Sequence, residues 1–259
     1  MRNPTGREAA GVLRDDATSA GERMAKTAQT AQERGFDGGQ VKLAVFDFDG
    51  TSIDGNSPVL LVKHLCRLRR LRIRVFACIL LWGVLYKLRL PQSEAWARSL
   101  VFTAFEGRPV DETDAFLMRF YDEHIDRLFK PQIEDAMRGH AADGEVVMVI
   151  SATFEPIVVE AMKSHPFSCQ LSTRMCATPE GTYTREVEGR PVEGAEKLVA
   201  VRSFADARYG RDGWFIDHAY GDHHSDRYVL EQARHAHAVS PDRPLRRMAR
   251  RRGWEILEW

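Results

Sequence analysis

Four short apolar runs, each ending in a polar residue, constrain the fold of this chain more than any other feature. They are VKLAVFD (41–47), EVVMVIS (145–151), GWFIDHAYGD (213–222) and HAHAVSP (235–241). Runs of this length fit buried parallel strands better than helices. Helix-like stretches lie between them, including 155–164 and 225–234. The alternation predicts an α/β fold, in which three layers are formed by a parallel sheet with helices on both faces.

Other segments depart from this alternation. Residues 56–144 are predicted to be nearly continuous helix, and we interpret them as a helical cap inserted between the first two strands. The α/β core would then consist of 41–55 and 145–259. Residues 1–40 lack sustained apolar periodicity and are predicted to be a mostly disordered lead. In 171–189, two runs with alternating polarity flank a Pro-Glu-Gly turn, which predicts a hairpin.

Composition argues against several classes of protein. Apolar residues make up 44% of the chain, which is enough for a sizeable core, and 37 basic residues balance 37 acidic ones. A balanced charge does not favour nucleic acid as a partner. The four cysteines form no C-x-x-C pair and are too few for a disulfide scaffold. The polar N-terminus lacks the apolar segment of a secretory signal, so we expect a cytoplasmic protein.

Two carboxylates follow the first predicted strand. Asp47 ends the run and Asp49 lies two residues later, with Gly50 and Thr51 supplying a tight turn. In open parallel sheets, ligands bind at the carboxyl ends of the strands. One carboxylate there can attack phosphorus, and a second can donate and later accept a proton. Two crowded carboxylates repel unless a divalent cation neutralises them, and hard oxygen ligands suit Mg²⁺.

Further polar residues are predicted at the same edge of the sheet. Ser151, Ala152 and Thr153 follow the second strand, where a hydroxyl group and backbone N–H groups can hold phosphate oxygens. Lys197 can stabilise negative charge on a transferring phosphoryl group. Taken singly these signals are weak, because a serine at a strand end is commonly a turn residue and most helical lysines are solvated.

The segment GDHHSD (221–226) adds two more carboxylates. Asp222 ends the third predicted strand and could complete a metal site, with Asp226 one helical turn later. Asp226 could instead cap the following helix. The adjacent His223 and His224 suggest zinc only superficially, because neighbouring side chains diverge and no partner has ligand spacing. We interpret the two histidines as loop residues.

In this order, the motifs D-x-D-G-T, a serine after the second strand, a lysine and G-D-x-x-x-D resemble the haloacid dehalogenase (HAD) superfamily. The phosphoserine-phosphatase-like branch, the HAD-IB hydrolases, is the most similar. The resemblance covers about residues 42–258, and 219–257 are similar throughout to the C-terminal block of that branch. It implies a HAD-like, Rossmann-like core with a cap that closes over a small phosphorylated substrate. It also implies a Mg²⁺-dependent phosphatase.

The resemblance also implies roles for individual residues. Asp47 would be the nucleophile and a Mg²⁺ ligand, and Asp49 the general acid/base, with its backbone carbonyl on the metal. Asp222 would be the third protein ligand. The remaining roles are phosphoryl binding by Ser151 and Lys197, with Ala152 and Thr153 beside them, and support from Asp226 and Thr51.

Two positions depart from the phosphoserine phosphatases. Those enzymes carry a glutamate shortly after the nucleophile that reads the ammonium group of the substrate, and the corresponding residue here is Asn56. They also carry a cap arginine that reads the carboxylate. Its place here is near Val101, with Arg98 one turn earlier. Phosphoserine itself is therefore not the expected substrate. Asp54, in the same loop, is interpreted as a cap of the first cap helix rather than as a pocket residue.

The stretch 63–90 has two interpretations. It holds eight basic residues and no acidic one, and its apolar centre, 75–86, is twelve residues long. As a helix that centre would span about 18 Å, short of the roughly 30 Å hydrocarbon core of a membrane. It could pack within the cap, or it could provide peripheral contact with an anionic membrane. The second interpretation would suit a lipid phosphatase of the phosphatidylglycerophosphatase type. A second basic cluster, at 246–252, is predicted to be an exposed helix face.

We therefore predict a phosphoric monoester hydrolase that acts through an aspartyl-phosphate on Asp47. The first alternative is the lipid phosphatase, which would be associated with the membrane. The second is a binding protein that keeps the fold without turnover. Transfer of the phosphoryl group to an alcohol is also open at this point, as are the substrate and the oligomeric state.

Overall fold

The computed structural model describes residues 39–68 and 102–259. Within them, a six-stranded sheet has the order β3-β2-β1-β6-β7-β8, and every neighbouring pair is parallel. Its strands are β1 (Val41–Asp47), β2 (Val146–Phe154), β3 (Cys169–Thr173), β6 (Trp214–Gly221), β7 (His235–Val239) and β8 (Glu255–Leu257). The predicted parallel α/β sheet is confirmed.

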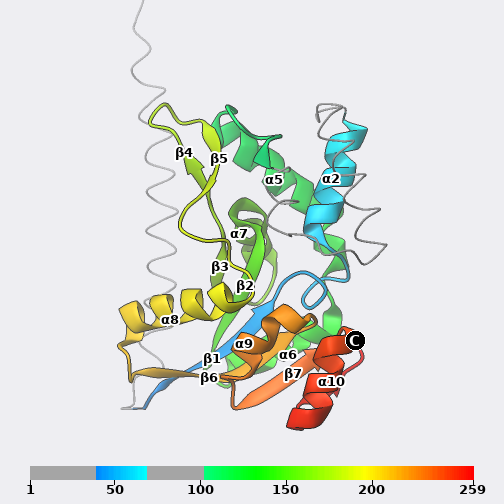
Figure 1. Cartoon of the computed structure of the whole chain (residues 1–259), viewed down its shortest axis with the longest axis vertical. Coiled ribbons are helices and arrows are strands. Elements are labelled where there is room, and N and C mark those ends of the chain that lie inside the picture. Colours follow the sequence, from blue (N-terminus) through cyan, green and yellow to red (C-terminus); the bar gives the residue numbers. More distant parts are fainter. Residues whose placement is uncertain (1–38, 69–101) are drawn as a thin grey trace, which may run out of the picture.

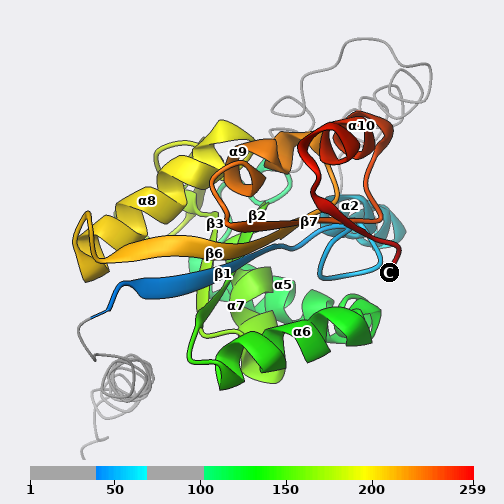
Figure 2. The same ribbon diagram turned by 90° about the horizontal axis from the view of Figure 1, so that it is seen from below.

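Helices cover both faces of this sheet, as Figure 2 shows. One layer holds α5 (Val110–His124), α6 (Pro131–Ala142) and α7 (Glu155–Ser164), and the other holds α8 (Ala195–Tyr209), α9 (Arg227–Leu230) and α10 (Arg243–Arg252). The buried strand β1 supplies both cores, because successive side chains of a strand point to opposite faces. Ala44 and Phe46 lie in one apolar cluster, whereas Leu43 and Val45 lie in the other.

The chain leaves the sheet after β1 through a short loop and enters α2 (Ser57–Arg67). The Asn56 side chain caps this helix by accepting a hydrogen bond from the Val59 backbone N–H at 3.1 Å. The prediction that Asp54 is the cap is wrong. Asp54 is exposed, and its backbone N–H donates to the Leu128 carbonyl instead. The helix begins two residues later than a cap at Asp54 requires, with Pro58 in its first turn.

The predicted hairpin is present, but it is shorter than the predicted segment. Antiparallel strands β4 (Met175–Ala177) and β5 (Tyr183–Val187) pair with each other outside the main sheet, and the start of the predicted segment belongs to β3. Figure 1 shows the hairpin beside α5, at the end of the molecule that also carries α2. The Gly107 backbone N–H donates to the Tyr183 carbonyl at 2.8 Å, which ties the hairpin to the chain before α5.

Two other expectations require correction. The second strand continues to Phe154, so Ser151, Ala152 and Thr153 lie within β2 rather than after it. The helix expected over 225–234 is reduced to a 3₁₀ turn, His224–Asp226, and the four residues of α9. The chain there must return within a few residues to start β7, which leaves no room for a longer helix.

The division into lead, core and cap remains a prediction, and one observation bears on its boundary. Helix α6 lies with α7 against the sheet (Figure 2), so its residues pack with the core although 56–144 was assigned to the cap. Residues 1–38 and 69–101 lie outside the described residues, as do Arg98, Val101 and most of the basic stretch 63–90. Among the residues that are described, no helix is long and apolar enough to span a membrane.

The basic cluster near the C-terminus lies on α10, as expected. Arg247, Arg250, Arg251 and Arg252 are exposed, and Leu245 and Ala249 are the buried residues on the opposite side of the helix. In the described part of the chain, the three cysteines Cys66, Cys169 and Cys176 are free thiols.

Candidate active site

The polar residues singled out in the sequence meet at the carboxyl edge of the central strands. Asp47 is the last residue of β1, Ser151 lies in β2, and Asp222 directly follows β6. Because these neighbouring strands run parallel, their carboxyl ends meet at one edge of the sheet. Lys197 comes from the first turn of α8. The first and last of these residues, Asp47 and Asp222, are 175 positions apart in sequence, yet the topology brings them together.

Lys197 joins two carboxylates in the interior of the site. Its buried ammonium donates a hydrogen bond to Asp47 Oδ1 and another, at 2.6 Å, to Asp226 Oδ1. Burial raises the pKa of Asp47 to about 8, with the Lys197 charge opposing the rise. Burial by itself would lower the pKa of Lys197, but Asp226 and Asp47 outweigh it and raise that pKa. The lysine therefore stays charged and compensates part of the negative charge.

Asp49 is held by the first residue of α2. The Ser57 backbone N–H donates to Asp49 Oδ1 at 2.5 Å, and the Ser57 hydroxyl donates to Oδ2 at 3.0 Å. Thr153 Oγ1 lies 2.7 Å from Ser57 Oγ and can donate a hydrogen bond to it. A residue of β2 therefore supports the serine that holds Asp49. Burial raises the pKa of Asp49 to about 7, although the two Ser57 bonds oppose the rise. A carboxyl group with this pKa can both donate and accept a proton near neutral pH.

Asp222 faces the turn that follows Asp49. Thr51 Oγ1 donates to Asp222 Oδ1 at 3.2 Å. Gly50 has φ +81°, and a Cβ atom there would lie 2.3 Å from Asp222 Oδ2, so only glycine lets the carboxylate approach this closely. Burial and the nearby Asp226 raise the pKa of Asp222 to about 6.

The carboxylates of this site suit a hard divalent cation. Ligand oxygens of Asp47, Asp222 and Asp226 lie within 4.8 Å of one another. Burial raises the pKa of both Asp47 and Asp222, and the negative charge of the neighbouring Asp226 adds to the rise. A cation among them would relieve this repulsion, so the donor set fits Mg²⁺.

The serine predicted to hold phosphate lies beside this cluster. Ser151 is buried in β2, and its Oγ accepts a hydrogen bond from the Thr153 backbone N–H at 3.0 Å. Ala152, between them, is half-buried. The strand therefore presents two hydroxyl groups, and Thr153 also belongs to the Asp49 network.

Two residues of the site were missed by the sequence analysis. Ser57 orients Asp49, as described above. Lys130 is buried and donates from Nζ to the Gly50 carbonyl at 2.6 Å, while its backbone N–H donates to the Ser52 carbonyl at 2.9 Å. Burial lowers the pKa of Lys130, and Asp54, Asp222 and Asp47 oppose that change. The only sequence signal was its position before Pro131, which indicates a helix start and no chemistry.

His223 and Asn56 have local capping roles. The His223 side chain accepts from the Ser225 backbone N–H, and Asp226 accepts from the His223 backbone N–H, which forms a capping box. Neither His223 nor His224 belongs to a possible metal-ligand group in the described part of the chain. Asn56 is exposed, and its side-chain oxygen is occupied as the cap of α2.

A family model of haloacid dehalogenase-like hydrolases matches residues 44–231, which include all of these carboxylates. The chain belongs to the haloacid dehalogenase-like hydrolase family. The resemblance inferred from the ordered motifs is thereby confirmed, and the protein is a HAD-family hydrolase. This identification excludes an unrelated α/β fold that shares only the D-x-D pattern.

Several known proteins and solved structures are similar to this HAD-family hydrolase. A phosphoserine phosphatase of Mycobacterium tuberculosis is 28% identical over 221 residues, which cover 83% of this chain and 70% of the relative. A probable phosphatase of the same organism is 35% identical over 127 residues, or 48% of this chain and 42% of the relative. Among solved structures, a Bordetella pertussis protein of unknown function has a TM-score of 0.73 at 23% identity, covering 85% of this chain and 99% of that one. A substrate-bound phosphoserine phosphatase has a TM-score of 0.59 at 16% identity, covering 85% and 94%.

Proposed function

We propose that this protein is a Mg²⁺-dependent phosphatase that hydrolyses a small phosphomonoester through an aspartyl-phosphate on Asp47. One observation carries the proposal: two neighbouring carboxylates are held in different environments. Lys197 contacts Asp47 as a charged partner, whereas Ser57 orients Asp49 and holds both of its oxygens. Separate environments allow one carboxylate to act as the nucleophile and the other as the proton donor.

In the first step, an oxygen of Asp47 attacks phosphorus, and the bond between phosphorus and the ester oxygen breaks. Asp49 donates its proton to the departing oxygen, which leaves as an alcohol. A pKa of about 7 lets Asp49 carry that proton at neutral pH. Ser57 fixes the direction of the transfer, because it holds the carboxyl group from the side of α2.

In the second step, water attacks the phosphorus of the aspartyl-phosphate. Asp49, now ionised, accepts a proton from that water. The bond between phosphorus and the Asp47 oxygen breaks, which releases inorganic phosphate and restores both carboxyl groups. Asp49 thus serves as the acid in the first step and as the base in the second, and it ends the cycle protonated as it began.

Lys197, Ser151 and Thr153 are proposed to bind the phosphoryl oxygens. Lys197 is buried and stays charged beside Asp47, where negative charge develops on the transferring group. The hydroxyl groups of Ser151 and Thr153 lie on β2 at the same edge of the sheet. In this arrangement Lys197 orients the nucleophile before substrate binds and stabilises the phosphoryl group afterwards.

The carboxylates of Asp47 and Asp222 and the backbone carbonyl of Asp49 would hold Mg²⁺, with Asp226 supporting them. When bound, the ion would neutralise the carboxylates and screen the charge of the incoming phosphate. Thr51 orients Asp222 through its hydroxyl group. Lys130 holds the turn by its bond to the Gly50 carbonyl.

The proposed substrate class is a small soluble phosphomonoester. Relatives named as phosphatases support the reaction type. Phosphoserine itself is not favoured, because Asn56, at the position where an acidic residue would read an ammonium group, is uncharged and already caps α2.

The test is phosphate release by the purified protein, with and without Mg²⁺. The panel would contain phosphoserine, sugar phosphates, nucleoside monophosphates and micellar phosphatidylglycerophosphate. We expect Mg²⁺-stimulated turnover of a small ester and its loss in Asp47→Asn, which keeps the size of the side chain. Near-native turnover by Asp47→Asn, with its fold intact by circular dichroism, would refute the mechanism. Turnover by neither protein across the panel would favour a binding protein, and preference for the lipid would favour the lipid phosphatase.

A further inference from the structure

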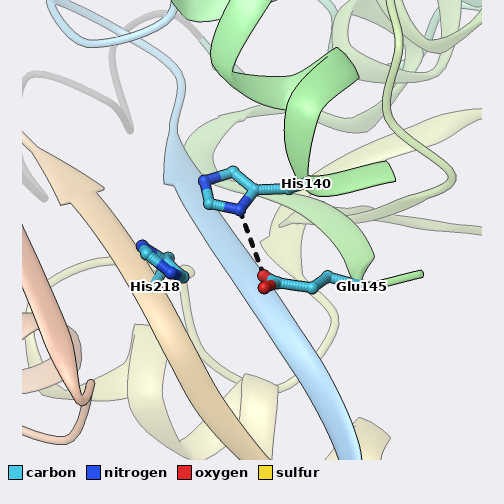
Figure 3. Close-up of side chains that lie close together, drawn as sticks. All are labelled: His140, Glu145 and His218. Carbon is cyan, nitrogen blue, oxygen red and sulfur yellow. Dashed lines mark ion pairs between the residues drawn. The ribbon is translucent and has the colours of Figure 1, made fainter. Parts of the chain in front are cut away.

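A second cluster of potential metal ligands lies away from the catalytic carboxylates. His140 is near the end of α6, Glu145 directly precedes β2, and His218 lies in β6 (Figure 3). One ligand atom from each residue can be chosen so that all three lie within 4.8 Å of one another. The turn between α6 and β2 brings the first two together, since the Glu145 backbone N–H donates to the His140 carbonyl at 2.9 Å. Three elements of the core thus converge on one point.

Glu145 is a buried carboxylate with an unsatisfied oxygen. Its side chain is 4% exposed, and Oε2 lies 3.2 Å from Nδ1 of His140, whose side chain is 11% exposed. Figure 3 shows the two side chains directed toward each other. Nevertheless, Oε2 accepts no hydrogen bond. A buried carboxylate oxygen without a hydrogen bond is costly, which indicates that a group absent from the polypeptide completes the site.

The hydrogen bonds behind His218 leave one ring nitrogen with a free lone pair. His237 Nδ1 lies 2.7 Å from Glu255 Oε2 and donates to this carboxylate. The other nitrogen of neutral His237, Nε2, must then accept, and His218 Nδ1 donates to it at 2.9 Å. Nε2 of His218 therefore carries the lone pair that a metal ion would take. A carboxylate–histidine relay of this kind commonly orients a metal-binding histidine.

His140 has a matching arrangement. Its Nε2 lies 2.9 Å from the hydroxyl oxygen of Tyr220 and can donate to it. In the tautomer that donates from Nε2, Nδ1 carries a lone pair that faces the Glu145 carboxylate, and a cation between them would be bound by both groups. Burial lowers the pKa of His140 and of His218, which favours the neutral rings that metal ions bind.

We propose that His140, Glu145 and His218 form a binding site for a divalent transition-metal ion of the Zn²⁺ class. Two imidazoles and one carboxylate are a common zinc donor set that leaves a position for a fourth ligand. The ion would join the end of α6 and the start of β2 to β6. His218 is only half-buried, which leaves a side of the site open for the ion to enter.

A neighbouring group is a poorer candidate. Asp217 and His235 can also be grouped with His218. However, Asp217 already forms an ion pair with Lys42 at 2.8 Å, and His235 is exposed. An exposed ligand and a neutralised carboxylate give weaker reason to expect a bound ion.

The proposed zinc site is separate from the proposed Mg²⁺ site. His218 is level with Ala44 of β1, three residues before Asp47. At about 3.3 Å per residue, these positions lie about 10 Å apart along the strand. The two sites also differ in chemistry, because imidazole suits Zn²⁺ and the all-carboxylate set suits Mg²⁺.

The test is the Zn²⁺ content of the full chain, freed of any purification tag and dialysed against Zn²⁺ in the presence of excess Mg²⁺. We expect one Zn²⁺ per chain and a higher melting temperature than for the chelator-treated protein. Asp222→Asn, altered in the carboxylate site, and His235→Gln, altered in the neighbouring group, should keep the ion. Glu145→Gln, which preserves side-chain shape, should lose it.

A second variant guards against misfolding of Glu145→Gln. His237→Gln changes the relay but no ligand, and it should weaken Zn²⁺ affinity by about 10- to 100-fold. The proposal is overturned if the wild-type chain retains no Zn²⁺, or if Asp222→Asn or His235→Gln loses the ion. It is also overturned if folded Glu145→Gln, or His237→Gln, binds Zn²⁺ as tightly as the wild type.

Discussion

Replacing Gly50 with alanine tests whether the turn after β1 positions the carboxylates that are proposed to be catalytic. Gly50 has φ +81°, and a Cβ atom would lie 2.3 Å from Asp222 Oδ2 and 2.7 Å from Asp222 Cγ. Ordinary contacts of a Cβ begin at about 3.4 Å, so the carboxylate must move by about 1 Å. That movement would break the hydrogen bond from Thr51, which is 3.2 Å long. It would also displace a proposed Mg²⁺ ligand.

The magnitude has two parts. The left-handed backbone conformation costs a residue with a side chain about 1 to 2 kcal/mol of folding stability. The movement of Asp222 acts on activity, because a misplacement of about 1 Å can cost about 100-fold in rate. We therefore expect kcat/KM to fall about 100-fold and the half-saturating Mg²⁺ concentration to rise.

Gly181→Ala is the matched control. Gly181 has φ +78°, close to the value for Gly50, but a Cβ atom there meets nothing within 4 Å. It lies in the turn of the β4–β5 hairpin, away from the carboxylates. This variant should show the same backbone strain of about 1 to 2 kcal/mol and nearly normal activity.

The assay combines Mg²⁺ titrations of phosphate release from p-nitrophenyl phosphate with guanidinium unfolding of both variants. Unfolding measures the shared backbone strain, and the titration measures the displacement of Asp222. If Gly50→Ala and Gly181→Ala have equal kcat/KM values and equal Mg²⁺ dependence, the close approach of Gly50 to Asp222 has no catalytic role. The reasoning about this turn would then be refuted.

Two further substitutions test the residues that the sequence analysis missed. Ser57→Ala removes the hydroxyl bond that favours ionised Asp49, so the pKa of Asp49 should rise. Because the first step needs protonated Asp49, the alkaline fall in kcat/KM should move to higher pH, and an unchanged pH–rate profile would contradict this role. Lys130→Met leaves the Gly50 carbonyl without its buried donor, at a cost of about 1 to 3 kcal/mol. Loss of the bond to the Gly50 carbonyl should lower kcat/KM. The half-saturating Mg²⁺ concentration should not rise, because the substitution also removes a positive charge that lies near Asp222 and Asp47 and would repel the ion. The exposed Lys163→Met is its control, and equal activity of the two variants would count against Lys130.

Much of the fold could be predicted because strand and helix signals are local. An apolar run such as 41–47 indicates a strand whose side chains are buried on both faces of the sheet, and the polar residue at its end marks the edge of that sheet. Boundaries were less predictable. The strand β2 continues through Ser151 to Phe154, because its backbone still pairs with β3 at Thr173. The polarity of residues 151–154 in the sequence does not show that they pair with β3.

Capping and turn chemistry also depended on tertiary contacts. Asp54 and Asn56 are both good helix caps by residue type, and the sequence analysis assigned the cap to Asp54. In the structure the Asp54 backbone is bonded to the Leu128 carbonyl, so the helix starts after Asn56. A residue more than seventy positions away therefore decided which of two adequate caps was used.

The sequence by itself determined the parallel α/β class, the order of the motifs and the residue types at the strand ends. These follow from the local periodicity and chemistry of short segments. Only the tertiary structure decided that Ser57 orients Asp49, that Lys130 supports Gly50, and that His140 and Glu145 meet His218. Each of these contacts joins segments whose separation in sequence says nothing about their distance in space. The packing of helices on the sheet sets that distance, since it depends on the whole core.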